Sequence, residues 1–253
     1  MAVLSTTHSR AEIIERRDFS ADLWAVRMKP EARFNFVPGQ YATFGVMENG
    51  KMIERPYSIV SSPYEETLEF FFELVPHGEL TPRLYKLQVG DSVLMRKVPK
   101  GRFILDVKSG HKRHYLVSTV TGLAPFVSMA RAFRKDWLEG RFREGFELFA
   151  LQGASRSWEL GYREEMEAYA AELPWLTYVP AISRPWEDKD WKGEVGRCED
   201  ILRKYSDQFG LGPEETTGYL CGHPEMIEKA KGILQRRGFA KESLREELYW
   251  VQK

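Results

Sequence analysis

Hydrophobic and polar positions alternate in short runs through the first part of the chain, between residues 11 and 107. The apolar runs are separated by turn-forming pairs such as Pro38-Gly39. Short strands divided by such turns are typical of an antiparallel β-barrel or sandwich. One short helix is expected to interrupt them, capped by Thr81, with Pro82 in its first turn and its end at Leu87. The predicted strands include residues 23–26, 40–46, 68–75 and 92–95.

After the turn at Ser109-Gly110 the pattern changes to apolar strands that alternate with longer amphipathic helices. Strands that alternate with helices form parallel, doubly wound sheets, which bind ligands at the carboxyl ends of their strands. This change of period predicts two domains, residues 1–108 and 109–253. The predicted strands cover 115–119, 146–151, 176–182 and 218–221, and the predicted helices cover 125–137, 159–172, 197–209 and 224–237.

Composition excludes several other classes of protein. The chain has 253 residues, 43% of them hydrophobic, which is enough for two packed domains. Its 37 Lys and Arg balance its 37 Asp and Glu, so no overall attraction to nucleic acid or to an anionic membrane is expected. The sequence shows no signal-type segment and no apolar run of membrane-spanning length, which predicts a cytoplasmic protein. We expect it to be a monomer.

Metal chemistry is not expected either. The only cysteines are Cys198 and Cys221, too few for a four-cysteine iron–sulfur or zinc site. The five histidines show no helical metal-binding pair. Any one-electron partner must therefore be a separate molecule.

The segment Arg55-Pro56-Tyr57-Ser58 combines three side chains that suit a flavin. The guanidinium of Arg55 can bind a pyrophosphate with several donors, and Tyr57 offers an aromatic face. The hydroxyl of Ser58 can hydrogen-bond a ring nitrogen whose charge changes during reaction. The alternative is an ordinary edge strand with a solvated arginine.

Two segments at predicted strand ends suit a dinucleotide. In the first, Gly122 allows close approach of the backbone and Pro125 begins a helix, whose free N–H groups attract a pyrophosphate. An ordinary glycine turn is the alternative, since Val120 stands where a first glycine would help. In the second, Cys221 ends a strand, where it is either a small core residue or a neighbour of a nicotinamide. No Ser-His-Asp or Cys-His-Asn order is present, so we do not expect covalent hydrolysis.

Two arginines follow further strand ends. Arg184 comes directly after the strand at 176–182, and Arg197 opens the next helix. Together they could bind a 2′-phosphate, which would favour NADP over NAD. Each is also a residue type that is commonly exposed without a ligand.

These segments together resemble the ferredoxin–NADP reductase family in its bacterial form, from about Phe36 to the end of the chain. The resemblance implies an N-terminal antiparallel six-stranded FAD-binding β-barrel, followed by a Rossmann-like parallel-sheet domain that binds NADP. It also implies an enzyme that exchanges hydride with NADP(H) and single electrons with ferredoxin or flavodoxin, a ferredoxin/flavodoxin–NADP+ oxidoreductase. The motifs that carry it are residues 36–41, 55–58, 78–84, 121–126 and 221–226.

The resemblance also implies roles for individual residues. For catalysis it places Ser58 near the flavin N5 and Cys221 beside the hydride path, and we add Glu247 as a source of a proton or of polarity. Trp250 is favoured over Tyr249 as the aromatic that covers the flavin, the alternative being a pair that only packs a terminal helix. The implied FAD site comprises Arg55, Pro56, Tyr57, Ser58, Phe71, Phe72, Glu73, Leu74, Glu79, Leu80, Thr81, Thr121, Tyr249 and Trp250. The implied NADP site comprises Ser155, Arg156, Ser183, Arg184, Arg197, Gly222 and Met226.

The chain departs from the family pattern at three points. Ser155 stands where the family has an arginine, with Arg156 one position later, so one phosphate contact is lost or shifted. Val120 replaces a glycine, which would narrow the entry for nicotinamide. The segment 186–194 is longer and more acidic than expected, through Glu187, Asp188, Asp190 and Glu194. A preference for NADP is still expected.

An acidic carrier such as ferredoxin or flavodoxin would dock on a basic surface. The sequence offers a basic cluster in which Asp106 is the only opposing acidic residue. The alternative is that these basic side chains form an ordinary solvated face around the domain junction. Two other functions stay open: a flavin reductase or the reductase component of an oxygenase, and a non-catalytic regulatory subunit that binds flavin and nucleotide. The basic cluster comprises Arg96, Lys97, Lys100, Arg102, Lys108, Lys112 and Arg113.

Overall fold

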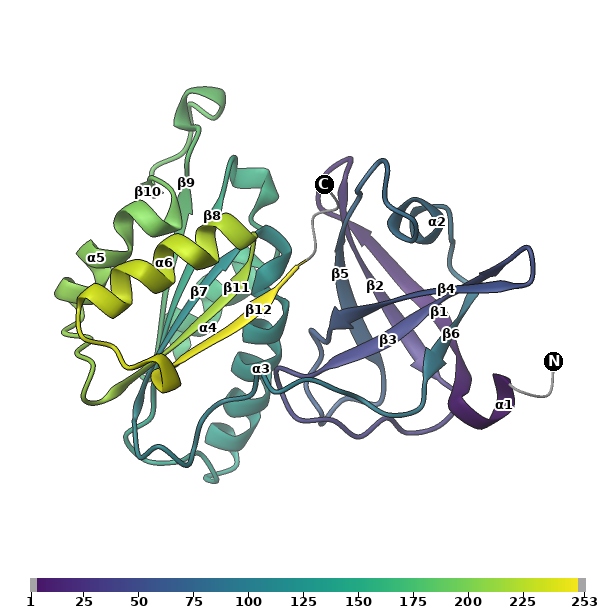
Figure 1. The fold of residues 1–253 in the computed structure, drawn as a ribbon, viewed down its shortest axis with the longest axis horizontal. Coiled ribbons are helices and arrows are strands. Elements are labelled where there is room, and N and C mark those ends of the chain that lie inside the picture. Colours follow the sequence, from purple (N-terminus) through teal and green to yellow (C-terminus); the bar gives the residue numbers. More distant parts are fainter. Residues whose placement is uncertain (1–3, 250–253) are drawn as a thin grey trace.

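The computed structural model describes residues 4–249 and shows two sheet domains side by side (Figure 1). The first is a six-stranded antiparallel sheet in the order β4-β3-β6-β1-β2-β5. A bridge between Ile59 and Phe70 joins its two outer strands, so the sheet curls into a barrel. This confirms the predicted antiparallel domain. Its elements are α1 (Leu4–Thr7), β1 (His8–Asp18), β2 (Leu23–Pro30), β3 (Tyr41–Glu48), β4 (Lys51–Ser58), β5 (Leu68–Glu73) and β6 (Ser92–Arg96).

The middle of strand β5, Phe70–Phe72, is apolar on both faces because it has a core on each side. Phe70 and Phe72 point into the barrel, where Phe72 lies 5.2 Å from the ring of Trp24. Phe71 points the other way and contacts the rings of Phe19 and Tyr162 at 5.2 and 5.3 Å. Successive residues of a strand face opposite sides, so a run without polar positions indicates a strand buried on both sides.

Helix α2 (Thr81–Tyr85) is where predicted, but it ends two residues earlier, and its predicted cap was wrong. The N-cap residue is Leu80, and no side chain caps the helix. The hydroxyl of Thr81 instead accepts a hydrogen bond from the Val75 N–H at 3.0 Å. Thr81 therefore fixes the loop before the helix, because that loop turns back close enough for its hydroxyl to reach.

The second domain is a parallel sheet in the order β10-β9-β8-β7-β11-β12. Tyr115 and Val117 pack against α5 and α6, whereas Leu116 between them packs on the side of α3 and α4. Helices therefore cover both faces, as Figure 1 shows, and the predicted doubly wound fold is confirmed. The elements are β7 (Arg113–Thr119), α3 (Ala124–Leu138), β8 (Glu147–Ala154), α4 (Arg163–Glu172), β9 (Leu176–Ile182), β10 (Glu194–Val195), α5 (Cys198–Gln208), β11 (Thr216–Gly222), α6 (Pro224–Arg236) and β12 (Leu244–Leu248).

Two elements of this domain differ from the prediction. The helix expected from Glu159 begins at Arg163, because Tyr162 adopts a left-handed backbone conformation with φ 63° that a helix cannot continue through. The segment after α6 forms the edge strand β12 beside β11, where the sequence indicated only a tail. The predicted domain boundary after residue 108 lies in the connection from β6 to β7.

The two domains share a core. Phe71 and Phe103 of the first half belong to the same buried cluster as Phe126 and Tyr219 of the second. The Ser128 hydroxyl, also buried, donates to the Ser61 carbonyl oxygen at 2.7 Å. Such an interface resembles a domain interior more than a contact between independent domains.

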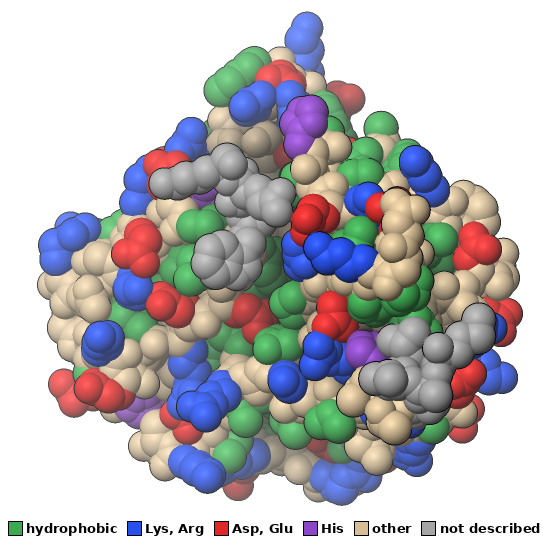
Figure 2. All heavy atoms as spheres, turned by 45° about the vertical axis from the view of Figure 1, so that its right-hand side comes forward, with side chains coloured by type: hydrophobic (Ala, Val, Ile, Leu, Met, Phe, Trp, Pro, Cys, Tyr) green, Lys and Arg blue, Asp and Glu red, His purple; other side chains and the backbone are tan. Residues whose placement is uncertain are grey.

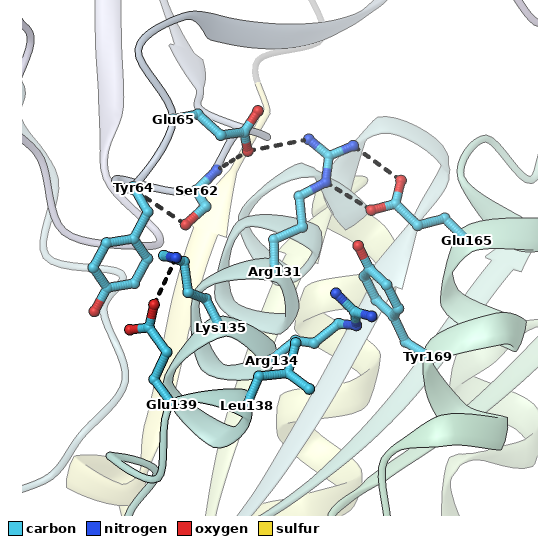
Figure 3. A pocket seen from close by; sticks show the side chains of 10 residues that line it. All are labelled: Ser62, Tyr64, Glu65, Arg131, Arg134, Lys135, Leu138, Glu139, Glu165 and Tyr169. Atoms are coloured by element: carbon cyan, nitrogen blue, oxygen red, sulfur yellow. Dashed lines mark hydrogen bonds and ion pairs between the residues drawn. The ribbon is translucent and has the colours of Figure 1, made fainter.

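A network of ion pairs crosses the same boundary (Figure 3). Arg131 of α3 donates two hydrogen bonds to Glu165 of α4, at 2.7 and 2.9 Å, and one to Glu69 of β5 at 2.5 Å. Glu69 also accepts from Arg27 at 2.9 Å and from the Tyr162 hydroxyl at 2.9 Å. Burial acts to lower the pKa of Arg131, but the bonds and charges of Glu165 and Glu69 outweigh it and raise that pKa. The guanidinium therefore holds two carboxylates from two domains.

No helix within residues 4–249 is both long and apolar enough to cross a membrane.

Candidate functional site

The barrel and the parallel sheet meet at a hydrogen bond between Ser58 and Glu247. Ser58 is the last residue of β4 and is 5% exposed. Its hydroxyl donates to a carboxylate oxygen of Glu247 on β12, a residue 189 positions away in the sequence. Glu247 lies opposite Cys221 in the register of β12 with β11. Three residues predicted as catalytic are therefore brought together.

Glu247 is poised to change its protonation near neutral pH. Burial raises the pKa of its carboxyl to about 7, against the opposing effect of the hydrogen bond from Ser58. A buried carboxyl favours its neutral form because the charged form loses solvation. Perturbed groups of this kind are common where protons move.

Tyr249 and Cys221 complete this cluster. The Tyr249 N–H donates to the Gly222 carbonyl oxygen at 3.2 Å, and its hydroxyl lies 3.4 Å from the Thr121 carbonyl oxygen. Cys221 is fully buried, and burial together with the Glu247 charge raises the pKa of its thiol. The sulfur is therefore a neutral thiol at physiological pH, unsuited to nucleophilic attack.

The turn after β7 approaches the end of β11 closely. A side-chain carbon added at Gly122 would collide with the Cys221 carbonyl oxygen, so only glycine fits there. Val120, two residues earlier, has φ 45°, a left-handed conformation that strains a β-branched residue. A glycine at this position would adopt it without strain. The strain therefore lies beside the residues that were predicted to meet the nicotinamide.

Arg55 and Tyr57 stand on β4 beside Ser58. The half-buried ring of Tyr57 is held by Phe44 at 5.0 Å and by Phe72 at 4.9 Å. The Arg55 side chain is 45% exposed and donates to the Glu79 carboxylate. The strand thus presents a cation, a fixed aromatic ring and a hydroxyl in sequence.

The other predicted FAD residues differ in how far their side chains are buried. The side chains of Phe71, Phe72 and Leu80 fill hydrophobic cores, so only their main-chain atoms are left to meet a ligand. Trp250 lies outside the described residues, so its predicted stacking stays a prediction. Pro56 and Glu73 are exposed, Leu74 and Thr81 are half-buried, and Thr121 is buried.

At the other end of the predicted site, β8 and β9 bring four residues together. The Arg184 N–H donates to the Ser155 carbonyl oxygen at 2.9 Å, and the Ser183 N–H donates to the Ala154 carbonyl oxygen. Glu187, which the sequence showed only as part of an acidic segment, accepts a hydrogen bond from Arg156. Its second carboxylate oxygen lies 3.5 Å from Arg184.

The remaining predicted NADP residues lie on neighbouring elements. Arg197 is the exposed N-cap residue of α5, and its charge acts on Glu225 and Lys229 of α6. Gly222 ends β11, and the Met226 side chain packs in the core beneath α6. The arginine that pairs with the same carboxylate as Arg184, that of Glu187, is therefore Arg156 and not the predicted Arg197.

The predicted basic cluster lies near more acidic residues than Asp106. The prediction that only Asp106 opposes it was therefore wrong. Arg96 pairs with Glu54, and Arg113 pairs with Glu147 at 2.8 Å. These partners are distant in sequence and come close only through folding. Figure 2 shows both signs of charge interspersed on the visible face.

These residues fit a flavin and a dinucleotide. Arg55 offers an exposed fork of donors for a pyrophosphate, Tyr57 a fixed ring, and Ser58 a buried hydroxyl joined to a carboxyl that titrates near neutral pH. A surface hollow of about 690 Å³ between Arg131, Glu65 and Glu165 is lined by none of the predicted site residues. Among residues 4–249 no group of acidic, histidine and cysteine side chains is arranged to hold a metal ion.

Comparison with known proteins agrees with this geometry. Residues 10–104 match the oxidoreductase FAD-binding domain, and residues 116–232 match the oxidoreductase NAD-binding domain. The ferredoxin–NADP reductase of Pseudomonas aeruginosa is 31% identical over 80% of this chain and 80% of its own length. The chain belongs to the ferredoxin–NADP reductase family. Another member, the flavodoxin/ferredoxin–NADP reductase of Rhodobacter capsulatus, is 30% identical over 81% of this chain and 77% of its own length.

A solved structure shares the fold of this reductase-family chain. The ferredoxin NADP+ reductase of Neisseria gonorrhoeae, with bound FAD and NADP, has a TM-score of 0.83, covering 97% of this chain and 100% of that one at 23% identity. The matched domains contain Arg55, Tyr57 and Ser58 on one side and Thr121, Arg184 and Cys221 on the other. The chain is an FAD-binding, NAD(P)-binding oxidoreductase of this family.

Proposed function

We propose that the protein exchanges hydride with NADP(H) and single electrons with ferredoxin or flavodoxin. The observation that carries this proposal is the Ser58–Glu247 hydrogen bond, which joins the FAD-binding domain to the edge strand β12 of the parallel sheet. The two strand-end segments that were predicted to bind a dinucleotide meet at the same cluster. The Thr121 carbonyl oxygen lies beside the Tyr249 hydroxyl, and Cys221 lies opposite Glu247. Bound FAD would accept a hydride from the nicotinamide and pass its electrons on one at a time.

The chain's own residues would position the reactants and accept the proton that is released when the electrons pass on to the carrier. Arg55 would neutralise the pyrophosphate of FAD, and Tyr57 would support its ring system. Ser58 would hydrogen-bond the ring, with Glu247 as the group that holds or releases a proton behind it. Cys221, neutral and buried, would limit the space beside the nicotinamide.

An acidic carrier protein would dock on exposed basic residues that form no ion pair within residues 4–249. Lys100 and Arg102 are exposed on the segment after β6, whereas Arg96 and Arg113 are engaged by carboxylates. Docking through Lys100 and Arg102 would depend on salt, because screening weakens attraction between exposed charges. The relatives named above act with ferredoxin or flavodoxin, which supports a carrier of this type.

Stopped-flow measurements on the FAD-loaded protein test the proposal. We expect rapid reduction by NADPH, followed by electron transfer to ferredoxin or flavodoxin whose second-order rate falls as salt is raised. The double variant Lys100→Ala/Arg102→Ala should lower that second-order rate and leave the rate of reduction by NADPH unchanged. Fast reduction with transfer only to free flavin would favour a flavin reductase instead.

Arg55→Ala should weaken FAD retention by about tenfold to hundredfold, because hydrogen bonds from a charged group contribute about 1.5–3 kcal/mol. Its present partner Glu79 is exposed, so breaking that pair costs little. The dissociation constant of FAD can be measured by fluorescence recovery on dialysis. Arg55→Lys keeps the charge without the fork and should give an intermediate loss, and an unchanged dissociation constant in Arg55→Ala would remove the assigned role.

A further inference from the structure

Glu187 lies between the two arginines at the ends of β8 and β9. One of its carboxylate oxygens accepts a hydrogen bond from Nε of Arg156, and the other lies 3.5 Å from a terminal nitrogen of Arg184. A carboxylate that presents two oxygens to two guanidinium groups has the arrangement that a phosphate would take there. The Arg156 guanidinium, assisted by Arg184, lowers the pKa of Glu187, so its carboxylate is ionised at neutral pH.

Local structure holds Glu187 in this position. A short 3₁₀ turn, Pro185–Glu187, follows β9, and the Glu187 N–H donates to the Arg184 carbonyl oxygen at 3.1 Å. Proline sets the backbone at the start of the turn, and the next residue, Trp186, is 69% exposed. The turn therefore directs Glu187 back over the strand ends.

Arg156 keeps its orientation independently of Glu187. Its terminal nitrogen Nη1 donates to Glu159 at 2.8 Å, and Glu159 also accepts from the N–H groups of Ser155 and Arg156. The hydrogen bond to Glu187 comes from the Nε edge of the guanidinium. If Glu187 moved away, that edge would face the space beside Arg184.

We propose that Glu187 is an internal anion that competes with the 2′-phosphate of NADP(H) for Arg156 and Arg184, and so sets the dinucleotide specificity. The inference rests on the proposed function, because it assumes that the dinucleotide binds at these strand ends. An arginine accommodates a 2′-phosphate, whereas an acidic residue suits the ribose hydroxyl of NAD(H) and repels the phosphate. NADP(H) must displace Glu187, but NAD(H) need not, so the chain discriminates less strongly between them than the two arginines alone would allow.

The test uses titration calorimetry of the FAD-loaded protein with two fragments that differ only in the 2′-phosphate. These are adenosine 2′,5′-bisphosphate and adenosine 5′-monophosphate. In Glu187→Gln, which keeps the size of the side chain and removes its charge, affinity for the bisphosphate should rise about fivefold. Affinity for the monophosphate should stay within about twofold, and steady-state preference for NADPH over NADH should rise by a similar factor to the bisphosphate affinity.

Two further variants separate the possible failures. Asp190→Asn removes one charge from the same acidic segment and should leave both affinities within about twofold. Arg184→Ala should weaken the bisphosphate and not the monophosphate. If Arg184→Ala has that effect while Glu187→Gln changes neither fragment, the competition is disproved and the 2′-phosphate site stands. If Arg184→Ala leaves the bisphosphate unaffected, the assumed site is wrong, and the inference with it.

Discussion

Arg131→Met should lower the free energy of unfolding by about 3 kcal/mol. The Arg131 side chain is 13% exposed and is held between Glu165 and Glu69, which are 23% and 11% exposed. Removing the guanidinium leaves two carboxylates near each other in a poorly solvated place. Breaking one member of a buried ion pair is costly for that reason, although replacing the whole set by apolar residues often is not.

Thermal unfolding of the FAD-loaded protein measures the effect, which corresponds to a midpoint about 6–12 °C lower for a chain of this size. Arg134→Met is the matched control on the same helix, because Arg134 pairs with Glu172 where both side chains are about one-third exposed. It should cost less than about 1 kcal/mol. Equal midpoints for the two variants would show that the interdomain network contributes no more than a surface pair.

Glu247→Gln should slow reoxidation of the reduced FAD by the carrier by about hundredfold, because the hydrogen delivered as hydride must leave as a proton when the electrons pass on singly, and general acid–base groups contribute at least about that much. The wild-type rate should also change with an apparent pKa near the value of about 7 that burial gives Glu247. In Glu247→Gln this dependence should be absent, because glutamine does not titrate. The readout is the single-turnover rate of reoxidation of the NADPH-reduced protein from pH 5.5 to pH 9 under saturating oxidised carrier.

Stability gives a second readout of the same group. The folded pKa of about 7 lies above the ordinary value of 4.5, so the folded state keeps a proton that the unfolded state loses between these two pH values. The wild-type protein is therefore destabilised relative to Glu247→Gln as pH rises through this window, by up to about 3 kcal/mol, and the difference is constant above it. Glu246→Gln, on the exposed side of β12 and paired with Lys231, should show neither effect. A wild-type profile that keeps its shape in Glu247→Gln would assign the titration to another group.

Sequence predicted the strands and helices of both domains well because their apolar periods differ so clearly. It placed β9 at its observed bounds, and β5 close to them, from the apolar run alone. It was wrong about the cap of α2 because a threonine before a proline is a cap signal only if the preceding loop leaves its hydroxyl available. It missed β12, because the three charged residues between Leu244 and Leu248, Glu247 among them, give no apolar strand pattern.

The sequence predicted only part of the candidate site. The resemblance to a family implied catalytic roles for Ser58 and Cys221, to which Glu247 was added, and folding brings the three into one cluster. The pairings of Arg156 and Arg184 with Glu187 were not foreseen, because ion pairs between loops depend on how two strand ends are set side by side. The acidic segment was a visible signal, but its charges could not be assigned to partners without the fold.

The core that the two domains share constrains how a substrate enters. Swinging the domains apart would expose Phe71 and Phe103, which lie in one buried cluster with residues of both halves. The edge strand β12 has a neighbour on one side only, and Tyr249 at its end is held by main-chain contacts to Gly222 and Thr121. Local fraying at this strand end is the smaller movement, and such motions take nanoseconds to microseconds, whereas domain hinges take microseconds to milliseconds. We therefore expect access to the site to be fast.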